Sequence, residues 1–473
     1  MPNINVLSLR YATKEMNDIF SEIGKIRFER KFWIAVLKTQ KLLGLDIPDK
    51  AIIAYEKAKE NIDLDLIKQI ELERRHDVKA RIEAFNIVSG EYELIHMGMT
   101  SRDLTDNVEQ MQIRMASQLI FGKYVAILKK FIERARLYDS IIFTARTHRQ
   151  PAQLTLLGRR FAMWAEELLN ALVDFEDFIL KYPLRGIKGP IGTQFDALSL
   201  LGDKKKVHVM ERKIAEHLGF EKIIDAPGQV YSRSLDYKMA SHLSLLSSAC
   251  ENFAKSIRLM SGHRLVTEGF VKGQVGSSSM PHKMNTRSSE RISGFCQLLK
   301  MYSDGASRIS GDQWEEGDVS CSVVRRVIIP DMFYVSDGLT ETTLTVLNEM
   351  GIYQNSIDKE VDTYLPFLVT TKLLSEATKR GIGREKAHGI IKKYAVEGAK
   401  TLRETDVEET DFIHRLGDDP EFPLDKDEIL KILEEKTRFI GNAKEQIDRI
   451  VKKSQKLIKK YSTEASYEPK RIL

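Results

Sequence analysis

The spacing of apolar residues predicts long helices through the middle of the chain. Seven apolar residues recur at alternating steps of four and three: Met239, Leu243, Leu246, Cys250, Phe253, Ile257 and Met260. This spacing places their side chains on one face of a helix, as in the core of a bundle of long helices. Segments 103–138, 152–181 and 319–353 show the same helical spacing, without a convincing alternation of period two.

The spacing of prolines also favours long helices. No proline occurs in residues 49–150, 228–280 or 331–365. An interior proline costs a helix about 3 kcal/mol, so these intervals permit unusually long helices. A bundle of such helices needs neighbours on more than one face, and we therefore expect the protein to form oligomers.

These patterns predict an all-α fold of three helical domains. The expected boundaries are an N-terminal helical domain at 1–101, a central long-helix bundle at 102–354 and a more charged C-terminal helical domain at 355–473. We expect the segment after Tyr461 either to fray or to dock on the rest of the protein.

The composition limits the classes of partner. Of the 473 residues 42% are hydrophobic, and the formal net charge is only +5. This mild basicity suits a small anionic substrate and argues against a nucleic-acid partner. The three cysteines are widely spaced, which favours a reducing compartment. Neither a secretory signal nor an apolar run of about 18 residues is present, so we expect a cytoplasmic protein without a membrane partner.

The segment from Gly276 to Asn285 has the most distinctive composition in the chain. Its ten residues, GSSSMPHKMN, hold three serines, a glycine, a proline, a lysine and an asparagine. This composition favours a loop that carries a charged anchor over a helix or a strand. A plain surface loop is the alternative interpretation.

Two further groups of polar residues precede the predicted bundle. Arg75-His76-Asp77 is either a local salt link on a helix or part of a site. Thr100 and Ser101 follow His96 and come before an apolar periodic run, as expected of a helix N-cap. Free backbone N–H groups at such a helix end would also attract a carboxylate.

Two groups lie within the predicted bundle. Pro151 suits the first turn of a helix and would place His148 at its mouth. Histidine suits proton transfer near neutral pH, although an isolated histidine is more often structural. Ser322 and Arg326 are four residues apart and would share a helix face, as a phosphate site or as part of a solvated arginine pair. Arg10 and Tyr11, expected before the first helix, offer an anion and a stacking contact.

The loop matches the pattern G-S-S-x-M-P-x-K-x-N and resembles the active-site loop of the fumarase/aspartase superfamily. The order of all five groups resembles the adenylosuccinate lyase family from Arg10 to Arg326, and residues 383–388 resemble it more loosely. The resemblance implies a homotetramer with a twenty-helix core and active sites shared between subunits. It also implies β-elimination of fumarate from adenylosuccinate, giving AMP, and from succinylaminoimidazole carboxamide ribotide in purine biosynthesis, without a cofactor or a metal.

The same resemblance implies a role for individual residues. Ser277 would be the catalytic base and His148 the acid, while Lys283 and Asn285 would hold the substrate carboxylates. Glu290 would orient His148. Further positions match substrate contacts, namely Arg10, Tyr11, Arg75, His76, Asp77, Thr100, Ser101, Gln229, Arg291, Ser322 and Arg326, with His96 and Thr147 in support.

The chain departs from the family pattern at three positions. Thr286 replaces a proline after the loop asparagine, Arg81 stands where some relatives have a second histidine, and Gly317 stands where some have an arginine. The last departure removes a phosphate contact, for which Arg81 or Arg325 would have to compensate. The alternatives are another fumarate-releasing lyase of the superfamily, of the argininosuccinate lyase or cycloisomerase type, and a non-catalytic helical scaffold.

Overall fold

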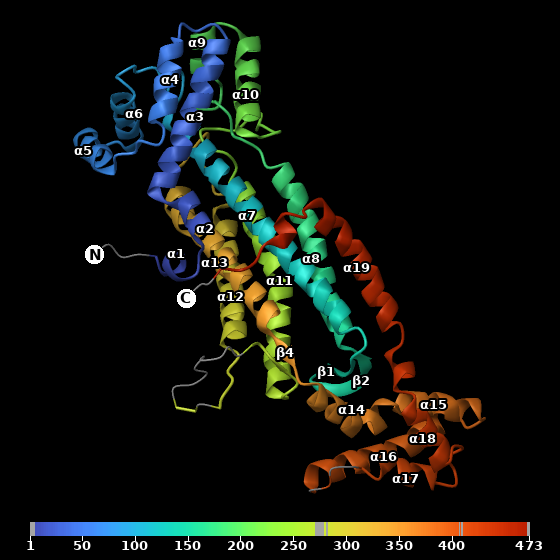
Figure 1. Ribbon diagram of the computed structural model, residues 1–473. Coiled ribbons are helices and arrows are strands. Elements are labelled where there is room, and N and C mark those ends of the chain that lie inside the picture. Colours follow the sequence, from blue (N-terminus) through green and yellow to red (C-terminus); the bar gives the residue numbers. More distant parts are fainter. Residues whose placement is uncertain (1–4, 270–278, 281, 406, 408–409, 471–473) are drawn as a thin grey trace.

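The computed structural model describes residues 5–269, 279–280, 282–405, 407 and 410–470. The predicted all-α class is confirmed. The molecule is an elongated bundle with a smaller group of helices at each end (Figure 1). Ser277 lies outside the described residues, as do eight other positions between 270 and 278.

The central bundle consists of the long helices that the apolar spacing predicts. They are α7 (Ser101–Leu137), α8 (Leu157–Leu180), α11 (Ser234–Gly262), α12 (Arg287–Ile309) and α13 (Cys321–Glu349). All seven residues of the predicted apolar seam on α11 are buried, from Met239 at 0% exposure to Met260 at 4%. Pro330 lies inside α13, so the proline-free interval underestimates the length of this helix.

Most of the N-terminal helices lie at the upper end of the bundle, and the first two pack lower down on α13 (Figure 1). They are α1 (Val6–Arg10), α2 (Lys14–Phe20), α3 (Glu22–Leu42), α4 (Asp49–Ala58), α5 (Leu64–Arg74) and α6 (Asp77–Val88), joined from later in the chain by α9 (Phe195–Leu201) and α10 (Lys204–Leu218). Arg10 is the last residue of α1 and does not precede the first helix, as the sequence had suggested.

The C-terminal helices form a second apolar cluster at the lower end of the bundle. They are α14 (Gln354–Leu368), α15 (Thr370–Lys379), α16 (Arg384–Glu404), α17 (Phe412–Gly417) and α18 (Lys426–Glu434), followed by the short 3-10 helix η1 (Lys436–Ile440). Helix α19 (Ala443–Lys460) then returns along α7 and α8 (Figure 1). A last 3-10 turn, η2 (Glu464–Ser466), packs on α7, so the segment after Tyr461 docks on its own chain.

The predicted start of a helix at Pro151 is wrong. Strands β1 (Ile142–Thr147) and β2 (Gln150–Leu156) form an antiparallel hairpin, and α8 begins only at Leu157. Pro151 is therefore a strand residue, and no helix mouth lies beside His148. The hairpin packs on α14 and η1, and these tertiary contacts outweigh the helical spacing of the segment. A second short pair joins β3 (Val266–Thr267) to β4 (Gly351–Ile352).

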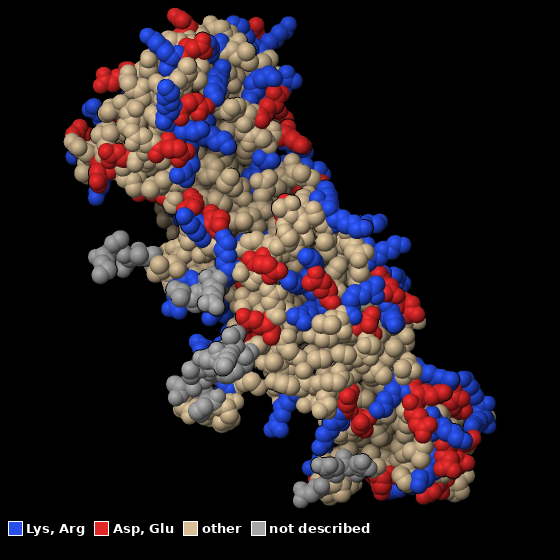
Figure 2. All heavy atoms as spheres, in the orientation of Figure 1, with Lys and Arg blue, Asp and Glu red and all other residues tan. Residues whose placement is uncertain are grey.

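The surface charge is mixed. On the face shown in Figure 2, basic and acidic side chains alternate at both ends of the molecule, and mostly uncharged atoms form a band across the lower bundle. In the described part of the chain, no helix is both long and apolar enough to cross a membrane.

Candidate active site

The upper end of α7 is built as the sequence predicts. Thr100 is the N-cap residue of this helix, and its N–H donates to Asp103 Oδ2 at 2.8 Å. Ser101 is the first helical residue, and both hydroxyl residues are partly exposed. The free N–H groups of a helix N-terminus lie beside two hydroxyls here, which is a suitable place for a carboxylate.

Asp103 fixes this end of α7 to a loop that is distant in sequence. Its carboxylate is fully buried and pairs with the equally buried Arg185. Oδ1 also accepts the N–H groups of Lys188 at 2.8 Å and Gly189 at 3.0 Å. A buried carboxylate needs donors of this kind, and Asp103 has a full set. The position of Thr100 and Ser101 is therefore rigidly held.

Ser322 and Arg326 lie on α13 next to this helix end. Arg102 donates from Nη2 to Ser322 Oγ at 2.8 Å and from Nη1 to Asp106 Oδ1 at 3.3 Å. Ser322 and Arg326 share a helix, as predicted, and Arg326 is exposed. The two helices therefore place hydroxyls and guanidinium groups side by side.

Neither Arg325 nor Arg81 is free to replace a missing phosphate contact. Arg325 is buried, with Nε 2.7 Å from Asp236 Oδ2 and Nη1 2.6 Å from Glu109 Oε2. Burial by itself would lower the pKa of Arg325, but these two carboxylates outweigh it and raise the pKa. Arg81 pairs with the buried Glu29 at 2.7 Å. The expectation that Arg81 or Arg325 compensates for the missing arginine at position 317 is therefore corrected.

Gln229 packs against Gly317, the glycine that stands where some relatives have an arginine. Its N–H donates to Glu316 O at 2.6 Å. A Cβ at Gly317 would lie 2.6 Å from Gln229 Cβ, which is closer than real Cβ contacts come. An arginine at 317 would therefore displace Gln229, so the glycine and this predicted substrate contact belong to one local arrangement.

Arg75-His76-Asp77 occupies a turn between two helices and not a helix interior. Arg75 ends α5 with φ +53°, and His76 is the N-cap of α6, its Nδ1 accepting the N–H of Lys79 at 3.3 Å. Asp77 Oδ1 lies 3.6 Å from the same Nδ1, so the two side chains are neighbours but do not form a salt link while Nδ1 accepts the Lys79 N–H. Because the ring accepts at Nδ1, the other nitrogen can point outward as a donor.

His96 lies below the N-terminus of α7. Its Nδ1 accepts the indole N–H of the buried Trp33 at 3.1 Å. Burial lowers the pKa of His96 to about 4, and the nearby Asp103 offsets this only in part. His96 is therefore a neutral structural acceptor near pH 7.

Tyr11 and Arg291 meet along the bundle, and Arg10 precedes Tyr11 in the chain. The Tyr11 ring packs edge-on to Phe295 at 5.0 Å between centroids, and the Arg291 guanidinium lies 5.8 Å from the Tyr11 ring centre. Arg10 is exposed beside them. This group combines two cations with an aromatic ring, as stacking over a nucleotide would require.

The C-terminal side of the loop is tied to α12. Lys283 is exposed, Asn285 is partly buried and Glu290 is exposed in the first turn of the helix. Glu268, which the sequence interpretation missed, is buried and accepts the N–H groups of Ser288 and Ser289, each at 2.9 Å. It caps α12 and thereby fixes where the loop ends.

His148 occupies the tip of the β1–β2 hairpin. His148 and Arg149 have φ values of +49° and +65°, so the turn places two non-glycine residues in the left-handed region. Thr147 and His148 are exposed. Among the residues that the structure describes, His148 has no side-chain hydrogen bond or ion pair.

The structure thus brings the predicted residues together in separate groups along one chain. The upper group holds Arg75, His76, Asp77, His96, Thr100, Ser101, Gln229, Ser322 and Arg326; the middle group holds Arg10, Tyr11 and Arg291; the lower group holds Thr147 and His148. Sequence reasoning missed Arg102, Asp103, Arg185 and Glu268. Asp103 was detectable at the third helical position after an N-cap threonine, whereas nothing local marks Arg185.

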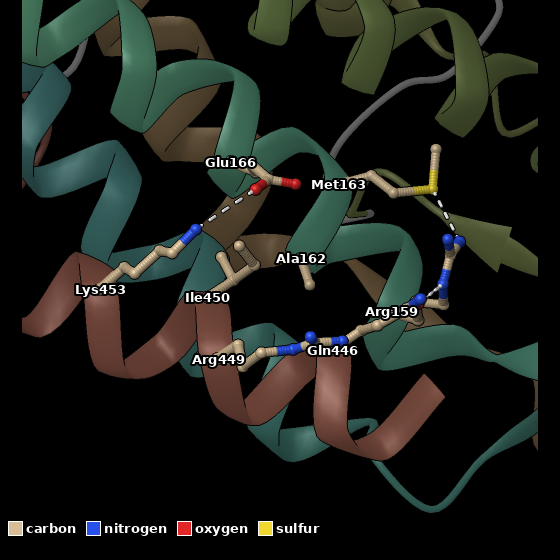
Figure 3. Close-up of a pocket in the computed structure, with 8 residues that line it drawn as sticks. All are labelled: Arg159, Ala162, Met163, Glu166, Gln446, Arg449, Ile450 and Lys453. Atoms are coloured by element: carbon tan, nitrogen blue, oxygen red, sulfur yellow. Dashed lines mark hydrogen bonds and ion pairs between the residues drawn. The ribbon is translucent and has the colours of Figure 1, made fainter. Parts of the chain in front are cut away.

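The cavities do not by themselves identify the site. The cavity shown in Figure 3 holds about 290 Å³ between α8 and α19, and none of its lining residues is a predicted site residue. Its Arg159 points towards Met163 and Gln446 (Figure 3), and Lys453 pairs with Glu166 at 3.9 Å. In the described part of the chain, no group of three His, Cys, Asp or Glu side chains is placed to hold a metal ion.

Comparison with known proteins identifies the family of the chain. A family described as "Lyase" matches residues 12–298, and one described as "Adenylosuccinate lyase C-terminus" matches residues 366–450. The adenylosuccinate lyase of Saccharomyces cerevisiae is 33% identical over 94% of this chain and 93% of its own length. That of Methanothermobacter thermautotrophicus is 27% identical over 96% and 99%.

Solved structures share the fold. The 3-carboxy-cis,cis-muconate lactonizing enzyme of Pseudomonas putida has a TM-score of 0.81 at 21% identity and covers 94% of this chain and 98% of its own. A fumarate lyase from Mesorhizobium has a TM-score of 0.79 at 18% identity, over 94% and 98%. With two family matches and full-length relatives in agreement, the chain belongs to the adenylosuccinate lyase family of the fumarase/aspartase superfamily.

Proposed function

We propose that the protein is a carbon–nitrogen lyase that releases fumarate from adenylosuccinate, giving AMP, and from succinylaminoimidazole carboxamide ribotide. The observation that carries this proposal is the likeness to adenylosuccinate lyases along nearly the whole chain. The placement of Ser322 and Arg326 beside the N-terminus of α7 supports it, because a nucleotide needs a phosphate site and a smaller dicarboxylate does not.

The two ends of the substrate would bind to different groups. Arg326 is exposed and has no ion pair with the residues that the structure describes, so it is available to a phosphate. Thr100 and Ser101 offer their hydroxyls to a carboxylate, beside the free N–H groups of the first turn of α7. Tyr11 and Arg291 offer a ring and a cation to the purine.

Elimination needs a base for the C–H proton and an acid for the departing nitrogen. We assign the acid to His148, by the match of its surrounding motif to the family, and the base to Ser277, by its match to the family loop. An alkoxide is costly at neutral pH, and exclusion of water together with the nearby Lys283 ammonium would lower that cost. Lys283 and Asn285 would stabilise the doubly charged carbanion, which is the largest electrostatic demand of the reaction.

A single subunit cannot assemble this site. Helix α7 has 37 residues and begins at Ser101, and the hairpin that carries His148 follows its other end. At 1.5 Å per residue the helix is about 55 Å long, far more than a substrate spans. We therefore propose a homotetramer in which His148 of one subunit meets the upper group of another.

Exposed apolar side chains on the bundle helices support this assembly. Val323 and Val327 share a face of α13 with 73% and 53% exposure, and Leu245 on α11 and Met301 on α12 reach 56% and 65%. Soluble monomers rarely leave such surfaces uncovered, so a second copy is the natural partner.

We also propose domain boundaries at residues 101 and 354, with α19 returning from the third domain to the bundle. Three cysteines that are free and buried support a reducing, cytoplasmic location.

An absorbance assay with adenylosuccinate tests the reaction. We expect AMP and fumarate in equal amounts, and no turnover of argininosuccinate. Absence of AMP at high enzyme concentration would contradict the proposal. Arg326→Met should raise KM for adenylosuccinate about ten-fold or more, because it removes a charge-assisted phosphate contact. Arg308→Met, at an exposed arginine of α12 outside the three groups, is the matched control and should leave KM unchanged.

A further inference from the structure

Three ionised side chains are buried together halfway along the bundle. Lys123 of α7 is 2% exposed, and Asp337 and Glu341 of α13 are fully buried. The Lys123 ammonium donates to Asp337 Oδ1 and lies 2.6 Å from Glu341 Oε1. One ammonium cannot satisfy two buried carboxylates, so the remaining oxygen atoms need other donors.

The two ends of the chain supply those donors. The N–H of Thr13 donates to Asp337 Oδ2 at 2.6 Å. The Tyr467 hydroxyl donates to Glu341 Oε1 and the Lys470 N–H to Glu341 Oε2, each at 2.5 Å. Residues 13 and 470 are therefore held by carboxylates one helical turn apart.

The N-terminal segment held in this way carries predicted substrate contacts. Tyr11 packs directly on Gly338. Gly338 lies between Asp337 and Glu341 in the sequence. A Cβ at Gly338 would lie 2.8 Å from Tyr11 Cβ and 3.2 Å from Tyr11 O, so only glycine permits this approach. Since Arg10 and Tyr11 immediately precede the tethered Thr13, the Asp337 contact determines where they lie.

The C-terminal segment lies near Arg291, the cation beside Tyr11. Glu468, Pro469 and Lys470 line a cavity of about 350 Å³ together with Ser288 and Arg291. This cavity lies between α12, α13 and the chain end.

Further contacts hold the C-terminal segment in place. Glu468 is bound by Lys130 at 3.0 Å and by Asn348 at 2.9 Å, and the Lys470 ammonium pairs with Glu15 of α2. The segment thus connects α7, α13 and the N-terminal helices.

We propose that Glu341 is a positioning residue for nucleotide binding, acting through the C-terminal segment 467–470. With Lys123 and Asp337 it holds this segment and residues 10–13 against α13, and it thereby sets Arg10, Tyr11 and Arg291 at the spacing that the nucleotide requires. The inference rests on the proposed function for the identity of the ligand, but not for the coupling between the two chain ends.

A merely structural ion cluster would behave differently. Its loss would lower the free energy of unfolding and the amount of active enzyme, without a selective change in KM. A positioning role instead predicts weaker nucleotide binding at nearly normal kcat, because His148 lies at the tip of the β1–β2 hairpin and outside this ion cluster.

The test is a pair of C-terminal deletions in the full-length protein. Deletion of 467–473 removes the two donors to Glu341 that come from the C-terminal segment, Tyr467 and Lys470, and leaves only Lys123. Deletion of 471–473 leaves every described contact in place. We expect the longer deletion to raise KM for adenylosuccinate about ten-fold, since hydrogen bonds to charged groups are the strong ones, with kcat within about two-fold. The shorter deletion should match the wild type.

Hydrogen exchange of residues 6–13 gives a readout that does not depend on catalysis. The longer deletion should speed exchange in this segment, and the shorter one should not. If the wild type did not cleave adenylosuccinate but the exchange changed, the proposed function would fail while the coupling stood. Unchanged KM and unchanged exchange after the longer deletion would overturn the inference, as would a fall in kcat alone.

Finer variants separate the contacts. Lys470→Ala keeps the N–H that binds Glu341 and loses only the pair with Glu15, whereas Lys470→Pro loses both. We expect a larger rise in KM for the proline variant than for the alanine variant. Equal KM values for these two would also overturn the role of Glu341.

Discussion

The two ends of α7 differ in how far the polar side chains near them are paired. At the upper end, Thr100 and Ser101 lie on a buried network in which Asp103 accepts hydrogen bonds from Arg185 and from three backbone N–H groups. At the lower end, His148 lies on an exposed two-residue turn, with no side-chain partner among the described residues.

This difference indicates which contacts fix the side chains in each half of the proposed site. The upper half is preorganised within one subunit, because its polar groups satisfy one another away from water. The lower half carries His148, the proposed proton donor, whose side chain has no partner among the described residues. If the site is shared, assembly would bring His148 against the rigid upper half.

The largest expected effect comes from placing the proposed acid and the proposed base on different chains. His148→Gln and Ser277→Ala should each lower kcat by about 10²–10⁴-fold, as expected on loss of an acid or a base. After mixing under conditions that exchange subunits, activity should return at roughly a quarter of the sites if the two residues come from different subunits. Steady-state assays before and after mixing measure this. A mixture as inactive as its components, with exchange verified by mass, would contradict a shared site.

A smaller effect compares the rigidity of the two ends. Arg185→Met leaves the Asp103 carboxylate buried without its guanidinium, and should lower the free energy of unfolding by about 3–5 kcal/mol. Arg149→Met, at the exposed hairpin turn, is the matched control and should change it by less than about 0.5 kcal/mol. Urea denaturation measures both. Similar losses in the free energy of unfolding for the two variants would contradict the difference between the two ends.

The smallest effect is a pH dependence at the upper end. The pKa of His96 falls from its ordinary value of 6.5 to about 4 on folding. The unfolded chain therefore binds the proton more readily, and stability is complete above pH 6.5 and is lost as the pH falls towards 4. The loss should reach roughly 3 kcal/mol. His96→Asn keeps an acceptor for Trp33 but cannot titrate, so its unfolding free energy should depend less on pH in this window.

Much of the fold was predictable because helix periodicity is a local property. The seam from Met239 to Met260, the long segments and the N-cap at Thr100 follow from spacing and from side-chain chemistry within a few residues. The hairpin at 142–156 was not predictable in this way. Its turn uses His148 and Arg149 at positive φ in place of the usual Asn-Gly, so the usual turn sequence is absent.

The sequence by itself determined most of the helices and the resemblance to the superfamily loop, and it proposed the residues that would carry the chemistry. Only the tertiary structure decided that Arg325 and Arg81 are engaged by carboxylates, that Gly317 accommodates Gln229, and that Asp337 and Glu341 hold both chain ends. The physical reason is that a charged side chain reveals its role only through its partner. Such partners come from segments far apart in sequence, which the bundle brings together when it packs its apolar faces.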